Sequence, residues 1–344
     1  MSDMKQDSDR VFPNNLLYKG DRAMKPQGRT SIAGCFALYD TDIIRATLKS
    51  SSLSGQKNIR PYLRKMLAAG GYRHLISPVN LDCIDEVDRL CPNFHEVSRE
   101  IRKAVALALM EGCAIRIPPI LLLGKPGIGK THYANEISKA LGVGMEFFSM
   151  SFITTGWIIG GATPIWEDAG IGNVARRLIE YQAANPFMFL DELDKVGNVK
   201  KYNPIGALYT LLEEETACSF RDEYLGIPID ASRVTWVATA NEERSIPPPI
   251  RSRMMSFSIR EPNRDEVRMI AREIYGEMVA KYPRSDFDSQ MDDRVIEKLS
   301  EMVPRDIRLT LISAFGSAAL ARRRHLTAED IRLVGSSKPK MGFC

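Results

Sequence analysis

The chain has 344 residues, of which 44% are hydrophobic and 26% are charged, which is the composition of a globular protein with enough chain for about two domains. Lysine and arginine outnumber aspartate and glutamate by only 47 to 43, so the net charge alone indicates neither a nucleic acid nor a membrane as partner. No apolar run approaches the roughly 18 residues that span a bilayer, which argues against a membrane partner and predicts a cytoplasmic protein.

The six cysteines are scattered along the chain, and only four histidines are available to join them. A structural zinc site needs pairs of ligands at short spacing, and the chain has no Cys-x-x-Cys pair. We therefore expect reduced, mostly buried thiols and no zinc site.

The chain divides into three segments, the first of which covers residues 1–90. Residues 1–30 are polar and interrupted by proline and glycine, and a Ser-rich stretch, LKSSSLSGQKN, follows at 48–58. These features predict a small, partly flexible N-terminal region, to which the sequence assigns no role.

The second segment, residues 91–261, has the pattern of an α/β domain. It starts with apolar residues spaced as on one face of a helix, at Val97, Ile101, Val105 and Leu109. Short, β-rich apolar runs then alternate with helical patterns. The runs lie at 120–123, 145–150, 187–190 and 234–239, and the helical patterns include 173–182 and 206–215. Such alternation predicts a parallel sheet with helices on both faces.

The third segment, residues 262–344, is helical throughout. Its predicted helices lie at 264–282, 292–303, 306–324 and 327–334, and Thr327 offers a capped start to the last of them. We therefore expect a C-terminal helical domain with a short tail.

Residues 124–131 match the pattern G-x-x-x-x-G-K-[ST] between a predicted strand and a predicted helix. The glycines let consecutive backbone N–H groups turn towards a phosphate, and the helix N-terminus adds partial positive charge. Lys130 is expected to neutralise the β and γ oxygens of ATP, and Thr131 to give its hydroxyl to Mg²⁺. The residues expected around the nucleotide are Gly124, Lys125, Pro126, Gly127, Ile128, Gly129, Lys130, Thr131 and His132.

Two further apolar runs end in residues that suit ATP hydrolysis. The run FMFL is followed by Asp191, a candidate Mg²⁺ ligand, and then by Glu192, whose carboxylate is placed to orient and deprotonate an attacking water. The run VTWVATAN ends in Asn241, whose amide suits that water or a γ oxygen. Together with the loop, these residues predict a Mg²⁺-dependent ATPase.

From about Pro92 to Val334 the chain resembles an AAA+ ATPase. The runs NPFMFLDELDK and FRDEYLGIPIDASRVTWVATANEERSIPPPIRSRM are similar to the ATPase module of Lon proteases. The resemblance implies a P-loop NTPase sheet domain followed by a helical lid. It also implies that Asn241 is the first sensor and that Arg253 is the arginine finger for the γ-phosphate of a neighbouring subunit, with Arg251 as the alternative.

The lid sequence MVPRDIRLTL is similar to the second-sensor helix of the same family. This resemblance implies that Arg305, or alternatively Arg308 one turn along, is the arginine that acts on the nucleotide of its own subunit. A finger supplied by a neighbour requires a closed ring, and the family implies a homo-oligomer of six subunits.

The segment 156–186 occupies the place of the first pore loop in Lon-type modules. There Trp166, followed by Glu167, falls where the family has an aromatic residue that grips a threaded polypeptide. A tryptophan folded back onto its own domain is the alternative. The stretch VGNVKKYNP is a looser candidate for a second pore loop, and its Lys200, Lys201 and Tyr202 also fit a solvated basic turn.

A Lon protease continues beyond its lid with a proteolytic domain, whereas this sequence ends at Cys344, so no proteolysis in cis is expected. The hypothesis is a ring-forming ATPase that remodels or threads a protein client. Two alternatives stay open, an AAA+ ATPase that acts on DNA and a nucleotide-dependent assembly factor or switch.

Overall fold

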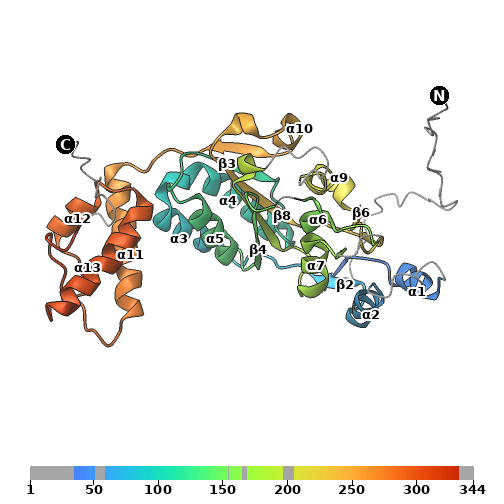
Figure 1. Cartoon of the computed structure of the whole chain (residues 1–344), viewed down its shortest axis with the longest axis horizontal. Helices are drawn as coiled ribbons and strands as arrows, with labels where there is room; N and C mark the ends of the chain where they lie inside the picture. Colours follow the sequence, from blue (N-terminus) through green and yellow to red (C-terminus); the bar gives the residue numbers. More distant parts are fainter. Residues whose placement is uncertain (1–34, 51–58, 154, 165–168, 197–204, 333–344) are drawn as a thin grey trace, which may run out of the picture.

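The computed structural model describes residues 35–50, 59–153, 155–164, 169–196 and 205–332. They form an α/β part built on a five-stranded parallel sheet and a C-terminal helical region beside it (Figure 1). This arrangement confirms the predicted fold class. Among the described residues, no helix is both long and apolar enough to cross a membrane.

The order of the strands determines which loops meet. The strands are β3 (Ile120–Leu123), β4 (Met145–Ser149), β5 (Phe187–Asp191), β8 (Thr235–Ala240) and β9 (Met255–Ser258). Their order is β4-β5-β8-β3-β9, and each neighbouring pair is parallel. Because parallel strands end at the same edge of a sheet, the segments that follow β3, β5 and β8 lie side by side.

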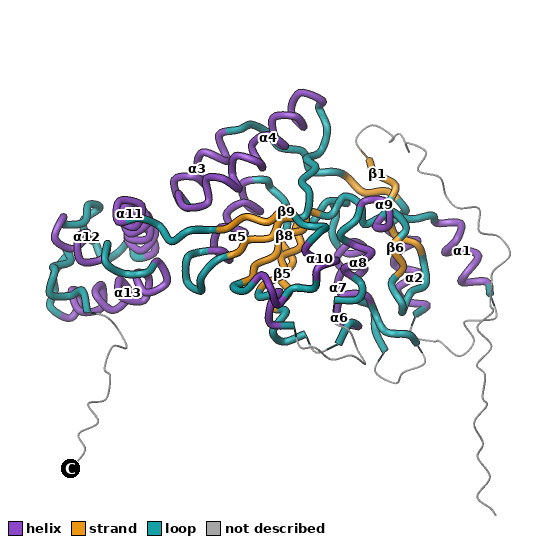
Figure 2. The backbone as a smooth tube through the Cα atoms, turned by 90° about the horizontal axis from the view of Figure 1, so that it is seen from above, coloured by secondary structure: helices purple, strands orange, loops and turns teal. Residues whose placement is uncertain are grey.

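Alternate residues of the central strands pack into separate cores on the two faces of the sheet. Leu121, Met188 and Trp236 face one core, and Leu122 and Phe189 face the other. Helices α7 (Asn173–Glu180) and α8 (Leu208–Leu211) cover the first face, and α3 (Asp82–Leu90), α4 (His95–Glu111) and α5 (Lys130–Ala140) cover the second. Figure 2 shows α3 and α4 on the opposite side of the strands from α7. Burial on both faces explains why these strands are continuous apolar runs.

Residues 35–50 and 59–74 of the N-terminal region pack on the first of these faces, whereas α3 of the same region covers the second. They contain an antiparallel pair of strands, β1 (Cys35–Ala37) and β2 (Tyr72–His74), and two helices, α1 (Thr41–Lys49) and α2 (Arg60–Ala69). Their buried side chains Leu38, Ile44, Leu63 and Met66 belong to the same core as the sheet residues. In Figure 1, α1 and α2 lie at the opposite end of the molecule from the C-terminal helices.

The C-terminal region has a core of its own. Helix α11 (Arg264–Lys281) begins with a capping box formed by Asn263 and Glu266, and α13 (Pro304–Leu320) has a proline in its first turn. These two helices and α12 (Asp293–Leu299) enclose a third cluster of apolar side chains.

Two predicted helices differ from the structure. The pattern at 206–215 is divided into α8 and α9 (Glu214–Ala217) because the backbone of Glu213 between them is extended, and the carboxylate of Glu213 pairs with Arg253. The predicted helix at 327–334 is wrong as far as residue 332, because the described residues form only a turn. There the carboxylate of Asp330 accepts hydrogen bonds from Thr327 and from Arg323.

Candidate nucleotide site

The phosphate loop, residues 124–131, connects β3 to α5, whose first helical residue is Lys130. Gly127 and Gly129 have φ angles of 83° and 101°, a region that favours glycine. A Cβ on Gly124 would lie 2.6 Å from a methyl of Ile128 and 2.7 Å from the carbonyl oxygen of Ile259. The glycines therefore follow from the conformation of the loop, which leaves its backbone open to the adjoining cavity.

Lys130 is almost completely buried, and its ammonium group is held by neutral oxygens. Its Nζ donates to the carbonyls of Gly124 (2.6 Å) and Lys125 (3.0 Å) and to Oδ1 of Asn241 (2.9 Å). Burial lowers the pKa of Lys130, and nearby acidic side chains act in the opposite direction. The lysine thus joins the loop after β3 to the end of β8.

The two acids at the carboxyl end of β5, Asp191 and Glu192, are held by a threonine of β8. Asp191 Oδ1 accepts a hydrogen bond from Thr239 Oγ1 (2.7 Å) and one from Thr131 Oγ1 (3.3 Å). The same Thr239 oxygen accepts the backbone N–H of Glu192 at 2.9 Å. Glu192 has φ 58° and ψ 49°, a left-handed conformation that is uncommon for a residue other than glycine and typical of functional sites.

Thr239 was not predicted as a site residue. It lies two positions before Asn241 in a β-branched strand, where a threonine is an ordinary strand former. The signal that was available is its place at the carboxyl end of β8, next to β5.

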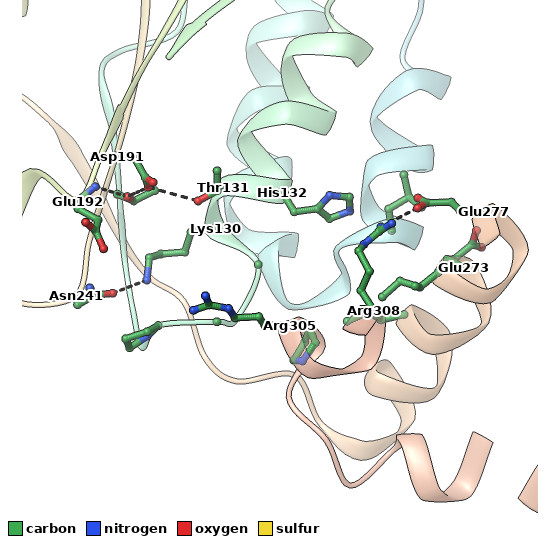
Figure 3. A pocket seen from close by; sticks show the side chains of 18 residues that line it. Lys130, Thr131, His132, Asp191, Glu192, Asn241, Glu273, Glu277, Arg305 and Arg308 are labelled. Atoms are coloured by element: carbon green, nitrogen blue, oxygen red, sulfur yellow. Dashed lines mark hydrogen bonds and ion pairs between the residues drawn. The ribbon is translucent and has the colours of Figure 1, made fainter. Parts of the chain in front are cut away.

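These residues line a cavity of about 530 Å³ at the junction of the α/β part and the C-terminal region (Figure 3). This volume is within the range of about 300 to 1,000 Å³ that is usual for small-molecule sites. The cavity brings together the following predicted residues: Pro126, Gly127, Gly129, Lys130, Thr131, His132, Asp191, Glu192, Asn241, Arg305 and its alternative Arg308. Helix α11 adds the apolar side chains of Ile270 and Ile274.

Three other residues that were predicted around the nucleotide belong to the phosphate loop but do not line the cavity. The side chain of Ile128 is buried in the core under α5, and Lys125 forms an ion pair of 2.9 Å with Glu261. The carbonyl oxygen of Gly124 accepts a hydrogen bond from Lys130. His132 lines the cavity, and burial lowers its pKa, which favours a neutral imidazole at neutral pH.

The structure distinguishes the two candidate arginines of α13. Arg308 forms an ion pair of 2.7 Å with Glu277 of α11, and Figure 3 shows it turned towards that residue. Arg305 lies against the phosphate loop, where a Cβ on Gly127 would be 3.7 Å from its own Cβ. Within the described residues Arg305 has no carboxylate partner, so its guanidinium is available to an anion in the cavity.

The two candidate finger arginines lie outside the cavity lining. Arg253 pairs through Nε with Glu213 at 2.8 Å and donates through Nη1 to the carbonyl of Pro249 at 2.6 Å. Arg251 is 3.5 Å from a carboxylate oxygen of Glu243. The predicted pore residues Trp166 and Glu167, and also Lys200, Lys201 and Tyr202, fall outside the residues that the structure describes.

Comparisons with known proteins identify the family and the fold. Residues 120–261 match the family described as "ATPase family associated with various cellular activities (AAA)". The fold is similar to that of a mutant of Thermotoga maritima RuvB, with a TM-score of 0.50 over 69% of this chain and 67% of that chain. The sequence identity of that pair is 17%, so the likeness concerns the fold alone. The chain therefore contains an AAA ATPase domain.

The curated relatives indicate a more specific relationship, to Lon proteases. The chain is 30% identical over 269 residues to the mitochondrial Lon protease homolog of Emericella nidulans, which is 72% of this chain and 24% of that protein. It is 33% identical over 177 residues to the Lon protease of Chloroflexus aggregans, which is 52% of this chain and 22% of that protein. The predicted relationship to the ATPase module of Lon proteases is confirmed, and the chain spans less than a quarter of the length of these relatives.

Proposed function

We propose that this chain binds ATP and Mg²⁺ in the cavity, hydrolyses the ATP, and does this work as a homo-oligomeric ring acting on a polypeptide. The observation that carries the proposal is the chain of contacts from Thr131 to Asp191, to Thr239 and on to Glu192, which connects the phosphate loop to the ends of β5 and β8.

The residues fit a magnesium-bound triphosphate. The Thr131 hydroxyl and the Asp191 carboxylate lie 3.3 Å apart, and both are oxygen ligands of the kind that Mg²⁺ prefers. Bound there, Mg²⁺ would neutralise part of the phosphate charge. Lys130 and the N-terminus of α5 would supply further positive charge.

Hydrolysis needs a base and a group that positions the water. Glu192 lines the cavity, and the hydrogen bond from its N–H to Thr239 holds its backbone. We assign it as the base that accepts a proton from the attacking water. Asn241 is held beside Lys130 and is assigned to position that water or a γ oxygen. Arg305 is assigned to bind the phosphates from the C-terminal region.

The position of Arg253 supports the proposed ring, because this arginine does not line the cavity of its own chain. Arg253 is fixed by Glu213 and Pro249 outside its own site, so it would serve the site of a neighbouring copy. An arginine at that place stabilises the charge of the transition state in related phosphoryl-transfer sites. A hexamer is the ring size that the family implies.

The polypeptide client is proposed from the relatives, which are named as proteases. The test is ATP turnover with Mg²⁺, alone and with either an unfolded polypeptide or duplex DNA. We expect turnover that the polypeptide stimulates and that Lys130→Ala abolishes through loss of ATP binding. Stimulation by DNA alone would replace the polypeptide with a nucleic acid client, and normal ATP binding by Lys130→Ala would refute the assigned site.

A further inference from the structure

The linker between the α/β part and the C-terminal region, residues 259–263, runs beside the phosphate loop. The N–H of Ile259 donates to the carbonyl of Leu123, the last residue of β3, at 2.6 Å. Glu261 forms an ion pair of 2.9 Å with Lys125 of the loop. The segment that carries the C-terminal region is therefore attached to the segment that is proposed to hold the phosphates.

Asn93 contacts both segments with a single amide group. It lies in the short 3₁₀ helix Pro92–Phe94 between α3 and α4, and its exposed fraction is 8%. Its Nδ2 donates to the carbonyl of Arg260 in the linker at 3.1 Å and to the carbonyl of Ile128 in the phosphate loop at 3.4 Å. An amide nitrogen carries two hydrogens, so each segment takes one of the two donors.

The short helix that carries Asn93 is itself packed against the phosphate loop and α5. The ring of Phe94 stacks on the ring of Tyr133 in the first turn of α5, with centroids 4.4 Å apart and an angle of 8° between the planes. A Cβ on Gly129 would lie 3.7 Å from the same ring. Asn93 is therefore fixed on the side of the loop, and its bond to Arg260 draws the linker towards that side.

Side chains join the other end of the linker to α11. Arg260 donates two hydrogen bonds to the carboxylate of Glu266, one of them 2.6 Å long. Glu266 also forms the capping box with Asn263, the last residue of the linker. Helix α11 shares its apolar core with α13, which carries Arg305. The position of Arg305 relative to the phosphate loop therefore depends on where the linker is held.

We propose that Asn93 is a positioning residue for the ATPase site, which holds the linker against the phosphate loop and thereby places Arg305 at the phosphates. This inference rests on the proposed function, in which the loop and Arg305 bind the nucleotide. Without the two hydrogen bonds of Asn93 the linker moves away from the loop more often, because the exposed pair of Lys125 and Glu261 contributes little by itself. Arg305 then reaches the phosphates in a smaller fraction of the molecules.

A double-mutant cycle between Asn93 and Arg305 tests this role. Asn93→Leu keeps the branched shape of the side chain and removes both donors. We expect it to lower ATP turnover at saturating ATP by about tenfold. If Asn93 acts through Arg305, the two substitutions are not additive, so adding Arg305→Ala should lower turnover by less than about a further threefold, against about 10- to 100-fold in the wild type.

Asn185→Leu is the matched control. Asn185 is also buried, and its amide binds both the N–H (2.9 Å) and the carbonyl (2.8 Å) of Ile76, but it does not line the cavity or contact the linker. In this variant Arg305→Ala should keep its full effect on turnover. Asn185→Leu thus shows what the loss of a buried amide does to the protein when Arg305 is not involved.

Hydrogen exchange at the N–H of Ile259, measured without nucleotide, follows the linker directly. We expect exchange about tenfold faster in Asn93→Leu and unchanged in Asn185→Leu, because only Asn93 binds the linker. If Asn93→Leu fails to fold, Asn93→Ser replaces it, since its hydroxyl is a single donor and holds at most one of the two carbonyls.

Additive effects of the substitutions at Asn93 and Arg305 would overturn the proposal, and so would unchanged exchange at Ile259. Full turnover in Arg305→Ala would refute the role of Arg305 and this proposal with it. If the wild-type protein does not hydrolyse ATP, the proposed function is refuted instead, and the exchange at Ile259 decides whether Asn93 holds the linker to the loop.

Discussion

Thr239 Oγ1 donates a 2.7 Å hydrogen bond to Asp191 Oδ1 across the pair of neighbouring strands β8 and β5. The same oxygen accepts the backbone N–H of Glu192. A single hydroxyl therefore sets the orientation of the proposed magnesium ligand and the position of the proposed base.

Thr239→Val removes this hydroxyl and keeps the branched shape. Because partners that orient a metal ligand are worth about 10- to 100-fold in metal affinity or activity, we expect the Mg²⁺ concentration for half-maximal ATP turnover to rise at least about tenfold. A magnesium titration of turnover measures this effect. Thr239→Ser is the matched control, since it keeps the hydroxyl and should stay near wild type. An unchanged magnesium requirement in the valine variant would show that the hydroxyl is dispensable.

Glu192→Gln separates binding from chemistry. The amide keeps the size of the side chain but cannot take a proton from water, so we expect ATP hydrolysis to slow by at least about 100-fold while ATP still binds. Turnover assays and a nucleotide-binding titration give the two numbers. The variant should also accumulate as an ATP-loaded oligomer, which a mass measurement in solution detects. Turnover near the wild-type rate would assign the base to another residue.

Much of this site could be predicted from sequence because its residues follow continuous apolar strands. A sheet buried on both faces makes such strands visible, and its parallel order brings Asp191 and Asn241 to one edge. Strand β9 was not predicted, because most of its residues are exposed at the edge of the sheet and it has no apolar run.

Residues whose roles depend on tertiary contacts could not be recognised from a local sequence pattern. Thr239 and Asn93 are each ordinary in their local sequence, and only the fold shows what they contact. Arg305 and Arg308 lie nearly one helical turn apart, so both suited the family pattern. What distinguishes the two arginines is Glu277, which lies in another helix and pairs with Arg308.

Arg305→Ala and Arg308→Ala test which of the two arginines acts on the nucleotide. Among the described residues Arg305 has no carboxylate partner, and it lies beside the phosphate loop, so its loss should lower ATP turnover by about 10- to 100-fold, the effect of one or two hydrogen bonds to a charged group. Arg308→Ala should cost less than about fivefold, because it mainly removes an exposed ion pair with Glu277. Turnover at saturating ATP compares the two variants. A larger deficit in Arg308→Ala would reverse the assignment.

Arg253→Ala tests the contribution of a neighbouring copy. We expect ATP binding close to wild type and a loss of turnover of about 10³-fold, the usual worth of an arginine finger. Mixing this variant with Glu192→Gln should restore part of the turnover, because an intact Glu192 then meets an intact Arg253 at some junctions. If Arg251→Ala shows the deficit and Arg253→Ala does not, the finger lies two residues earlier.

The stability of the fold should depend on pH through Asp222, whose buried carboxylate accepts the backbone N–H groups of Gly172, Tyr224 and Leu225. Burial raises its pKa to about 6 in the folded chain, above the ordinary aspartate value of 3.8, so between these values the folded state binds more proton than the unfolded state. The free energy of unfolding therefore falls as pH rises from 4 to 6, and this group contributes a change on the order of 3 kcal/mol.

Carboxylates with lowered pKa, such as Asp330 beside Arg323 and Glu266 beside Arg260, change stability in the opposite direction. They are present in both wild type and Asp222→Asn, so the difference between the two proteins isolates Asp222. Urea unfolding at pH 4.5 and at pH 7 should show the wild type losing stability relative to Asp222→Asn as pH rises. Parallel pH curves for the two proteins would mean that this carboxylate titrates as it does in the unfolded chain, so that its backbone hydrogen bonds offset the effect of burial on its pKa.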